Sequence, residues 1–210
     1  MPPRSYASAI RDAQVEKTRQ HLFDTARAML VEGGLDGLTL PKLAKAAGVS
    51  IPTVYRHFPT VDDLVRAFLE WIRPRVGQDP QRLLSCGAEE LPELPLKNYP
   101  RYEAEAQVLR PLMESKAFNR VRVASVRDRA KVAAAALRPR APGWSDAELE
   151  AMSGAIYALN SPIAWRWFRD TWGIESDEAA RAVSWAMRTM IEALARGPER
   201  PRPSKKGKKR

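Results

Sequence analysis

The stretch that decides the fold runs from Thr39 to Leu64 and reads TLPKLAKAAGVSIPTVYRHFPTVDDL. Apolar residues recur at helical spacing on both sides of Gly48, over segments too short for long helices. Thr39, Ser50 and Thr60 belong to the residue types that cap helix N-termini, and each stands where a helical pattern begins. The stretch therefore predicts a helix-turn-helix, in which a glycine-containing turn joins two short helices.

The same stretch suits a surface that faces DNA. No acidic residue occurs from Gly37 to Val61, whereas Lys42, Lys45 and Arg56 do. A short, slim second helix fits the major groove, which is about 12 Å wide, and free N–H groups at helix starts favour phosphate oxygens. The predicted DNA-binding residues are Thr39, Lys42, Ser50, Pro52, Thr53, Tyr55, Arg56, His57 and Thr60.

TLPKLAKAAGVSIPTVYRHFPTVDDL resembles the DNA-binding segment of TetR-family transcriptional regulators. The resemblance is carried by the alanine-rich second helix, by Ala-Gly-Val-Ser at the turn, and by Tyr-x-His-Phe followed by proline. It implies an all-α homodimer with an N-terminal helix-turn-helix domain and a larger helical domain for ligand binding and dimerisation. It also implies binding to a palindromic operator in double-stranded DNA, usually for repression, and release when a small, largely apolar effector binds.

The resemblance further implies roles for individual residues. Those expected at the sugar-phosphate backbone are Thr39, Lys42, Tyr55, His57 and Thr60. Those expected to probe base edges are Thr53 and Arg56. Two positions depart from the family pattern. Val61 stands where the family often has a phosphate-binding lysine, and Pro52 stands where small or polar residues usually contact the groove.

The composition bounds the remaining possibilities. The chain has 210 residues, of which 44% are hydrophobic and 29% charged, as in globular proteins of one or two domains. Its net charge is +10, but residues 197–210 alone hold seven basic residues and one acidic residue, a balance of +6. This tail either attracts DNA non-specifically or merely aids solubility. A single cysteine, Cys86, and the lack of a long apolar run predict a cytoplasmic protein with no membrane segment.

The pattern predicts four regions and no convincing strand. They are a flexible N-terminal arm (1–14), the DNA-binding domain (15–73), the ligand-binding and dimerisation domain (74–196), and a disordered basic tail (197–210). The first helix is expected over Val15–Glu32. Later helices are expected over Tyr102–Glu114 and Phe118–Leu137, after a capping box at Ser145 and Glu148, and from Ser176.

Apolar residues of the C-terminal half suggest a pocket and a dimer seam. Mid-helix residues expected to line the effector pocket are Met113, Phe118, Met152 and Tyr157. Residues expected at the dimer interface are Trp165, Phe168, Val183, Met187, Met190 and Leu194. This apolar seam can also cover the chain's own core. The basic run from Arg120 to Lys131 could recognise an acidic ligand such as an acyl-coenzyme A, but its charges fall around the helix and favour a solvated face.

An enzyme and an architectural DNA-binding protein are the two other classes of function to consider for this sequence. An enzyme is disfavoured because the chain has only two histidines and lacks HExxH, GxSxG, P-loop and CxxC patterns, so no catalytic residues, metal or cofactor are expected. A constitutive architectural DNA-binding protein would bind without sequence preference and with a steep dependence on salt. The sequence does not distinguish repression from activation.

Overall fold

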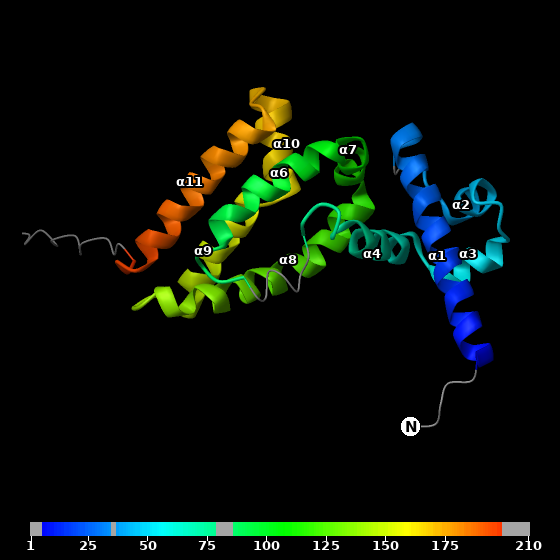
Figure 1. The fold of residues 1–210 in the computed structure, drawn as a ribbon, viewed down its shortest axis with the longest axis horizontal. Coiled ribbons are helices and arrows are strands. Elements are labelled where there is room, and N and C mark those ends of the chain that lie inside the picture. Colours follow the sequence, from blue (N-terminus) through cyan, green and yellow to red (C-terminus); the bar gives the residue numbers. More distant parts are fainter. Residues whose placement is uncertain (1–5, 35–36, 79–85, 199–210) are drawn as a thin grey trace, which may run out of the picture.

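The computed structural model describes residues 6–34, 37–78 and 86–198, and every regular element in these ranges is helical. Figure 1 shows an elongated molecule with α1, α2 and α3 at one end and α8 to α11 at the other. The helices of the N-terminal domain are α1 (Tyr6–Gly33), α2 (Leu40–Ala46), α3 (Ile51–His57) and α4 (Val61–Ile72). Those of the C-terminal domain are η1 (Leu91–Glu93), α6 (Leu94–Ala104), α7 (Ala106–Glu114), α8 (Lys116–Leu137), η2 (Arg138–Arg140), α9 (Asp146–Leu159), α10 (Pro162–Arg166), η3 (Trp167–Thr171) and α11 (Ser176–Leu194).

The first helix begins at Tyr6, nine residues before the predicted start at Val15. The prediction of a flexible arm is therefore wrong for residues 6–14, and residues 1–5 lie outside the described ranges. This part of α1 contains neither glycine nor proline, but it shows no buried stripe, because the side chains from Ala9 to Lys17 are exposed. The helical conformation of this segment follows from helix propensity alone. A search for apolar residues at helical spacing cannot detect it.

The core of the N-terminal domain forms where α1, α3 and α4 meet. Phe23 of α1 lies against the rings of Phe58 and Trp71, with centroid separations of 5.6 and 5.4 Å. Val54 of α3 is completely buried in the same cluster. Aromatic pairs at these separations add to the stability that burial alone provides. One face of α3 is thus held against this cluster.

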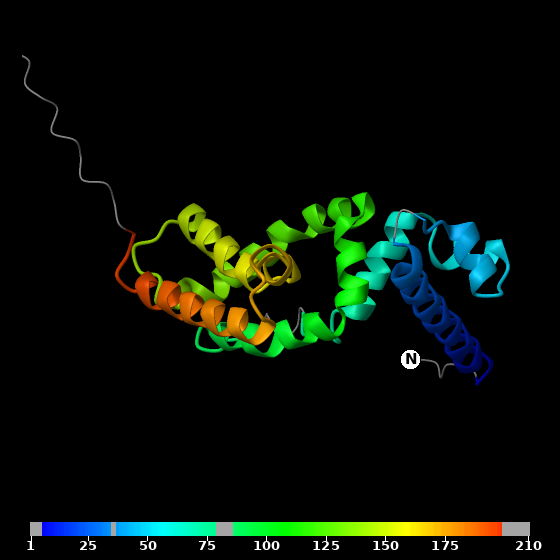
Figure 2. The same ribbon diagram turned by 90° about the horizontal axis from the view of Figure 1, so that it is seen from above.

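In the C-terminal domain, α8 packs along α9 and α6 packs along α11. Figure 2 shows α11 and α9 lying side by side at the end of the molecule opposite α1. The predicted capping box is present, because Ser145 accepts the backbone N–H of Glu148 and the Glu148 carboxylate accepts that of Ser145. The single helix predicted over Tyr102–Glu114 is instead broken at Glu105, between α6 and α7.

The apolar seam predicted for the dimer interface belongs mainly to the chain's own core. Four of its six residues have exposed fractions of 2% or less: Trp165, Val183, Met187 and Leu194. Phe168 and Met190 are half-buried and pack against that core. The assignment to a dimer interface is therefore wrong for the four buried residues, because a partner cannot reach them. The helical period shows that a stripe is apolar, but it does not show what covers it.

Among the described residues, two ion pairs connect the domains. Arg120 of α8 donates to the carboxylate of Asp62, in the first turn of α4, with an Nε to Oδ2 distance of 2.9 Å. Arg27 of α1 donates to Glu105, between α6 and α7, at 2.9 Å. The N-terminal domain is thus tied to the C-terminal domain at two separate points. Of the predicted basic tail, only residues 197 and 198 lie within the described ranges.

Candidate nucleic-acid interface and effector cavity

Three helices of the N-terminal domain begin in the same way, with a hydroxyl side chain that caps the N-terminus. The side chains of Thr39, Ser50 and Thr60 each accept the backbone N–H three residues further on, at 3.3, 3.3 and 3.1 Å. Pro41 and Pro52 occupy the first turns of α2 and α3, where no N–H is needed. The other free N–H groups of each first turn remain available to an anion.

The turn between α2 and α3 depends on one glycine. Gly48 has φ +64°, a left-handed conformation that residues with a Cβ adopt at a cost. The carbonyl of Ala47, at the end of α2, lies 2.9 Å from Nε2 of His21 in α1. Val54 and Phe58, one turn apart, are both buried and direct one face of α3 into the domain. The opposite face of α3 is left towards solvent.

The structure places most of the predicted DNA-binding residues on that open surface. Seven of the nine are exposed: Thr39, Lys42, Ser50, Pro52, Tyr55, Arg56 and Thr60. Thr53 is half-buried, and its hydroxyl lies 2.8 Å from that of Ser50. Val61 is half-buried against the domain core and offers no polar group. The exposed residues are distributed over α2, α3 and the residues that precede these helices and α4.

His57 differs from the expectation of a simple phosphate contact. Its Nε2 is enclosed by the protein and makes no hydrogen bond, so only Nδ1 can face a ligand without a change of rotamer. Burial, followed by the charges of Arg56 and Arg19, lowers the pKa of His57 below its ordinary value of 6.5. The ring is therefore mainly neutral at pH 7. As placed here, the ring could offer a ligand a hydrogen bond but little positive charge.

The two acidic residues that follow the motif, Asp62 and Asp63, are stabilised in their charged form by neighbouring side chains. A hydrogen bond from Arg120 holds the pKa of Asp62 below its usual range. Hydrogen bonds from Thr60 and then Arg66 do the same for Asp63. Both carboxylates lie in the first turn of α4, where the helix dipole also favours negative charge. Their charges are therefore compensated next to the proposed DNA surface.

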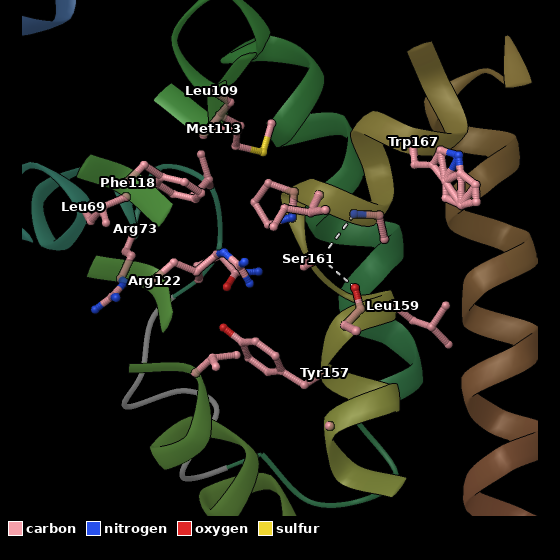
Figure 3. Close-up of a pocket in the computed structure, with 18 of the residues that line it drawn as sticks. Leu69, Arg73, Leu109, Met113, Phe118, Arg122, Tyr157, Leu159, Ser161 and Trp167 are labelled. Carbon is pink, nitrogen blue, oxygen red and sulfur yellow. Dashed lines mark hydrogen bonds between the residues drawn. The ribbon is translucent and has the colours of Figure 1, made fainter. Parts of the chain in front are cut away.

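A cavity of about 780 Å³ lies where α4, α7, α8, α9 and α10 meet (Figure 3). Three of the four predicted pocket residues line it: Met113, Phe118 and Tyr157. Met152 is not among its lining residues and is half-buried against the core instead. It precedes Tyr157 by five residues on α9, which rotates it about 140° away from the face that Tyr157 presents.

Besides the predicted Tyr157, the polar residues of the described cavity wall are Arg73, Gln78, Arg122 and Ser161, and of these the sequence analysis considered only Arg122, as part of the basic run. Gln78 donates to the hydroxyl of Tyr102 and to the carbonyl of Asn160, the latter at 2.9 Å. Within the basic run, Arg120 turns towards α4 and Arg122 towards the cavity, because two residues on a helix are about 200° apart. The solvated face predicted for this run is therefore wrong for Arg122.

The end of α4 also forms part of the cavity wall, through Leu69, Ile72 and Arg73. Sequence periodicity marks Leu69 and Ile72 only as inward-facing residues, and a core would satisfy that pattern equally well.

Over the described ranges, no helix is long and apolar enough to cross a membrane. Within those ranges no group of three or more His, Cys, Asp or Glu side chains is placed to hold a metal ion.

Residues 22–68, which run from α1 to α4, match the model of the bacterial regulatory proteins of the tetR family. This N-terminal domain belongs to the TetR family. The TetR-family segment is 38% identical over 66 residues to the HTH-type transcriptional repressor KstR2 of Mycobacterium tuberculosis, covering 30% of this chain and 33% of that protein. It is 32% identical over 65 residues to the HTH-type transcriptional regulator AcrR of Shigella flexneri, covering 31% and 30%. The match thus spans about a third of the length of these curated relatives.

Solved structures resemble the chain over most of its length. NalD, the secondary repressor of the MexAB-OprM multidrug efflux pump in Pseudomonas aeruginosa, has a TM-score of 0.63 at 23% identity, over 85% of this chain and 97% of NalD. GusR of Salmonella enterica has a TM-score of 0.56 at 18% identity, over 86% and 96%. At these identities the likeness concerns the fold alone. The predicted all-α architecture, a helix-turn-helix domain followed by a larger helical domain, is confirmed.

Proposed function

We propose that the chain is a dimeric transcriptional repressor that leaves its operator when a small molecule occupies the cavity. The observation that carries this proposal is the path of α4. This helix starts at Thr60, beside the exposed surface of α3, and ends at Leu69, Ile72 and Arg73 in the cavity wall. A ligand that contacts the end of α4 can therefore change the position of the DNA-binding surface at its start.

On DNA, α3 would enter the major groove with Arg56 at base edges and Tyr55 at a phosphate. Lys42 and the capped starts of α2 and α4 would contact the backbone on either side. Two such helices in a dimer would read a palindromic operator with half-sites about 34–36 Å apart, or a multiple of that distance. Only a few residues of α3 could make base-specific contacts with the operator, because the exposed surface of this helix is short.

Release follows if the ligand prefers the conformation that fits DNA less well. The drop in operator affinity equals the ratio of the ligand's affinities for the two conformations, so a ligand without such preference has no effect. The contacts of α8 with α4 and the Arg120–Asp62 ion pair couple the cavity to both ends of α4. A shift of α8 on ligand binding would thus act on α4 along its whole length.

Dimerisation would use exposed aromatic side chains in place of the buried seam. Trp167, Trp172 and Trp185 have exposed fractions of 55%, 67% and 70%, and they lie on η3, just after it, and on α11. Trp167 and Trp172 lie together, with ring centroids 6.4 Å apart, and large apolar side chains grouped on a surface are typical of protein interfaces. A second copy of the chain is the partner that fits, because a palindromic operator needs two recognition helices related by symmetry.

The decisive experiment is an electrophoretic shift assay with DNA from upstream of the chain's own gene, at moderate salt and with non-specific competitor. We expect preferential retention of one fragment. The double variant Tyr55→Ala/Arg56→Ala should lose this preference and remain dimeric in size-exclusion chromatography. Replacing exposed Lys97, on α6, by glutamine removes one charge far from α3 and should leave binding intact.

Two results would contradict the proposal. Equal binding to every fragment, with a steep decrease in affinity as salt rises, would favour the constitutive architectural protein instead. Loss of the dimer in the double variant would show that Tyr55 and Arg56 do not lie on a free DNA-binding surface.

A further inference from the structure

The cavity wall is apolar over most of its area, and its charged groups are few. The aliphatic and aromatic part includes Leu69, Leu109, Met113, Phe118 and Val126. A volume of about 780 Å³ lies within the range of roughly 300–1,000 Å³ that small-molecule sites occupy. The apolar wall alone would accept many neutral hydrophobic ligands, so the charged groups decide which chemical class is favoured.

Two arginines, Arg73 and Arg122, contribute to the described part of the wall, and their side chains differ in orientation. The guanidinium of Arg73 makes an ion pair with Glu70 on the same helix. In Figure 3 the side chain of Arg73 points away from the cavity, whereas those of Arg122 and Tyr157 extend from α8 and α9 towards the same part of it. A guanidinium group carries a positive charge in proteins. The cavity thus combines a permanent positive charge with an adjacent phenol hydroxyl.

The charge balance of the cavity favours an anion. Among the described residues of its wall there are two arginines and no aspartate or glutamate. A cation in an apolar enclosure attracts an anionic ligand more strongly than it would in water, because the effective dielectric constant is low. A guanidinium can also donate two parallel hydrogen bonds to one carboxylate, which gives geometric specificity.

We propose that the cavity binds an anionic amphiphile, an extended apolar molecule that ends in one carboxylate. The carboxylate meets Arg122, the Tyr157 hydroxyl donates a further hydrogen bond to it, and the apolar body lies against Phe118, Met113 and Leu109. The role of this molecule as an effector rests on the proposed function. Its binding to the cavity does not, and can be measured without DNA.

The test uses octanoate and octanamide, two probes of nearly equal size that differ in charge. Each is titrated into the full chain at pH 7.5, with isothermal calorimetry and tryptophan fluorescence as readouts. Trp167 lines the cavity and should report occupancy. We expect octanoate to bind at least about tenfold more tightly than octanamide, as charge-assisted hydrogen bonds to a guanidinium predict.

Variants then test whether Arg122 causes the preference for octanoate over octanamide. Arg122→Gln should reduce octanoate affinity to that of octanamide, whereas Arg122→Lys, which keeps the charge, should retain part of the preference. Lys97→Gln removes the same charge from an exposed site on α6 and should leave both affinities unchanged. Circular dichroism establishes that each variant is folded. The comparison of the two probes in the unmodified chain needs no variant at all.

Three outcomes would overturn the inference: octanamide binding as tightly as octanoate, a preference that survives Arg122→Gln, or no binding of either probe at millimolar concentration. Failure of the proposed function looks different. If octanoate binds through Arg122 but no DNA fragment is preferred, the repressor proposal fails and the ligand class stands. If a fragment is preferred and octanoate does not bind, the repressor proposal stands and the ligand class is wrong.

Discussion

The orientation of the recognition helix is tested most directly by truncating its two β-branched aliphatic residues, one at a time. Val54 has an exposed fraction of 0%, whereas Ile51, three residues earlier on α3, is 48% exposed. If the structure is right, Val54 anchors α3 to the domain core, whereas Ile51, the first residue of the helix, is left half-exposed to solvent. Replacing each by alanine should therefore have unequal effects on stability, although both changes remove apolar carbons from the same helix.

The magnitudes follow from burial. Val54→Ala removes two buried carbons, worth about 1.6 kcal/mol at roughly 0.8 kcal/mol each, and the cavity left behind raises the loss to about 2–3 kcal/mol. Ile51→Ala removes three carbons that are only half-buried, about 1.2 kcal/mol at the same rate, and leaves no enclosed cavity. Alanine is the better helix former and returns up to about 0.5 kcal/mol in both variants. The net losses are then about 2 kcal/mol for Val54→Ala and less than about 1 kcal/mol for Ile51→Ala.

Urea denaturation of the full-length variants, followed by circular dichroism, measures both losses. The comparison is valid if the slope of free energy against urea stays unchanged, because a changed slope indicates an altered unfolded state or a non-two-state transition. Equal losses, or a larger loss for Ile51→Ala, would show that α3 does not pack on the domain core through Val54 as it does in the structure. The exposed positions of Tyr55 and Arg56 would then lose their basis as DNA contacts.

Three further predictions concern single side chains. Ser50→Ala removes the N-cap of α3 and should lower stability by about 1 kcal/mol in thermal denaturation, whereas Ser50→Gly should cost only a few tenths. Because the pKa of His57 is lowered by burial and nearby arginines, stability should be full above pH 6.5 and fall as the pH decreases below that value towards the lower folded-state pKa. His57→Gln should flatten this part of the pH profile, and an unchanged profile would assign it to another group. Trp185→Ala should weaken the dimer in sedimentation equilibrium, and an unaltered dimer would exclude this face of α11 as the interface.

The resemblance of Thr39–Leu64 to the TetR family was found from the sequence because its signals are local. Each cap involves a hydroxyl and an N–H three residues apart, and the turn needs one glycine with positive φ. Such interactions depend on neighbours in the chain and little on the rest of the fold. The all-α class followed for the same reason, since helical periodicity is also a local property.

Only the tertiary structure decided which side chains meet in the cavity and which apolar faces stay open. Arg122 and Arg120 are two residues apart and identical in type, yet one lines the cavity and the other pairs with Asp62. Trp165 is buried, whereas Trp167, two residues further on, is exposed. These differences depend on helices far away in the sequence that cover one side of a helix and not the other. A local sequence pattern does not show which face of a helix a distant helix covers. The caps and the turn, in contrast, involve residues only a few positions apart.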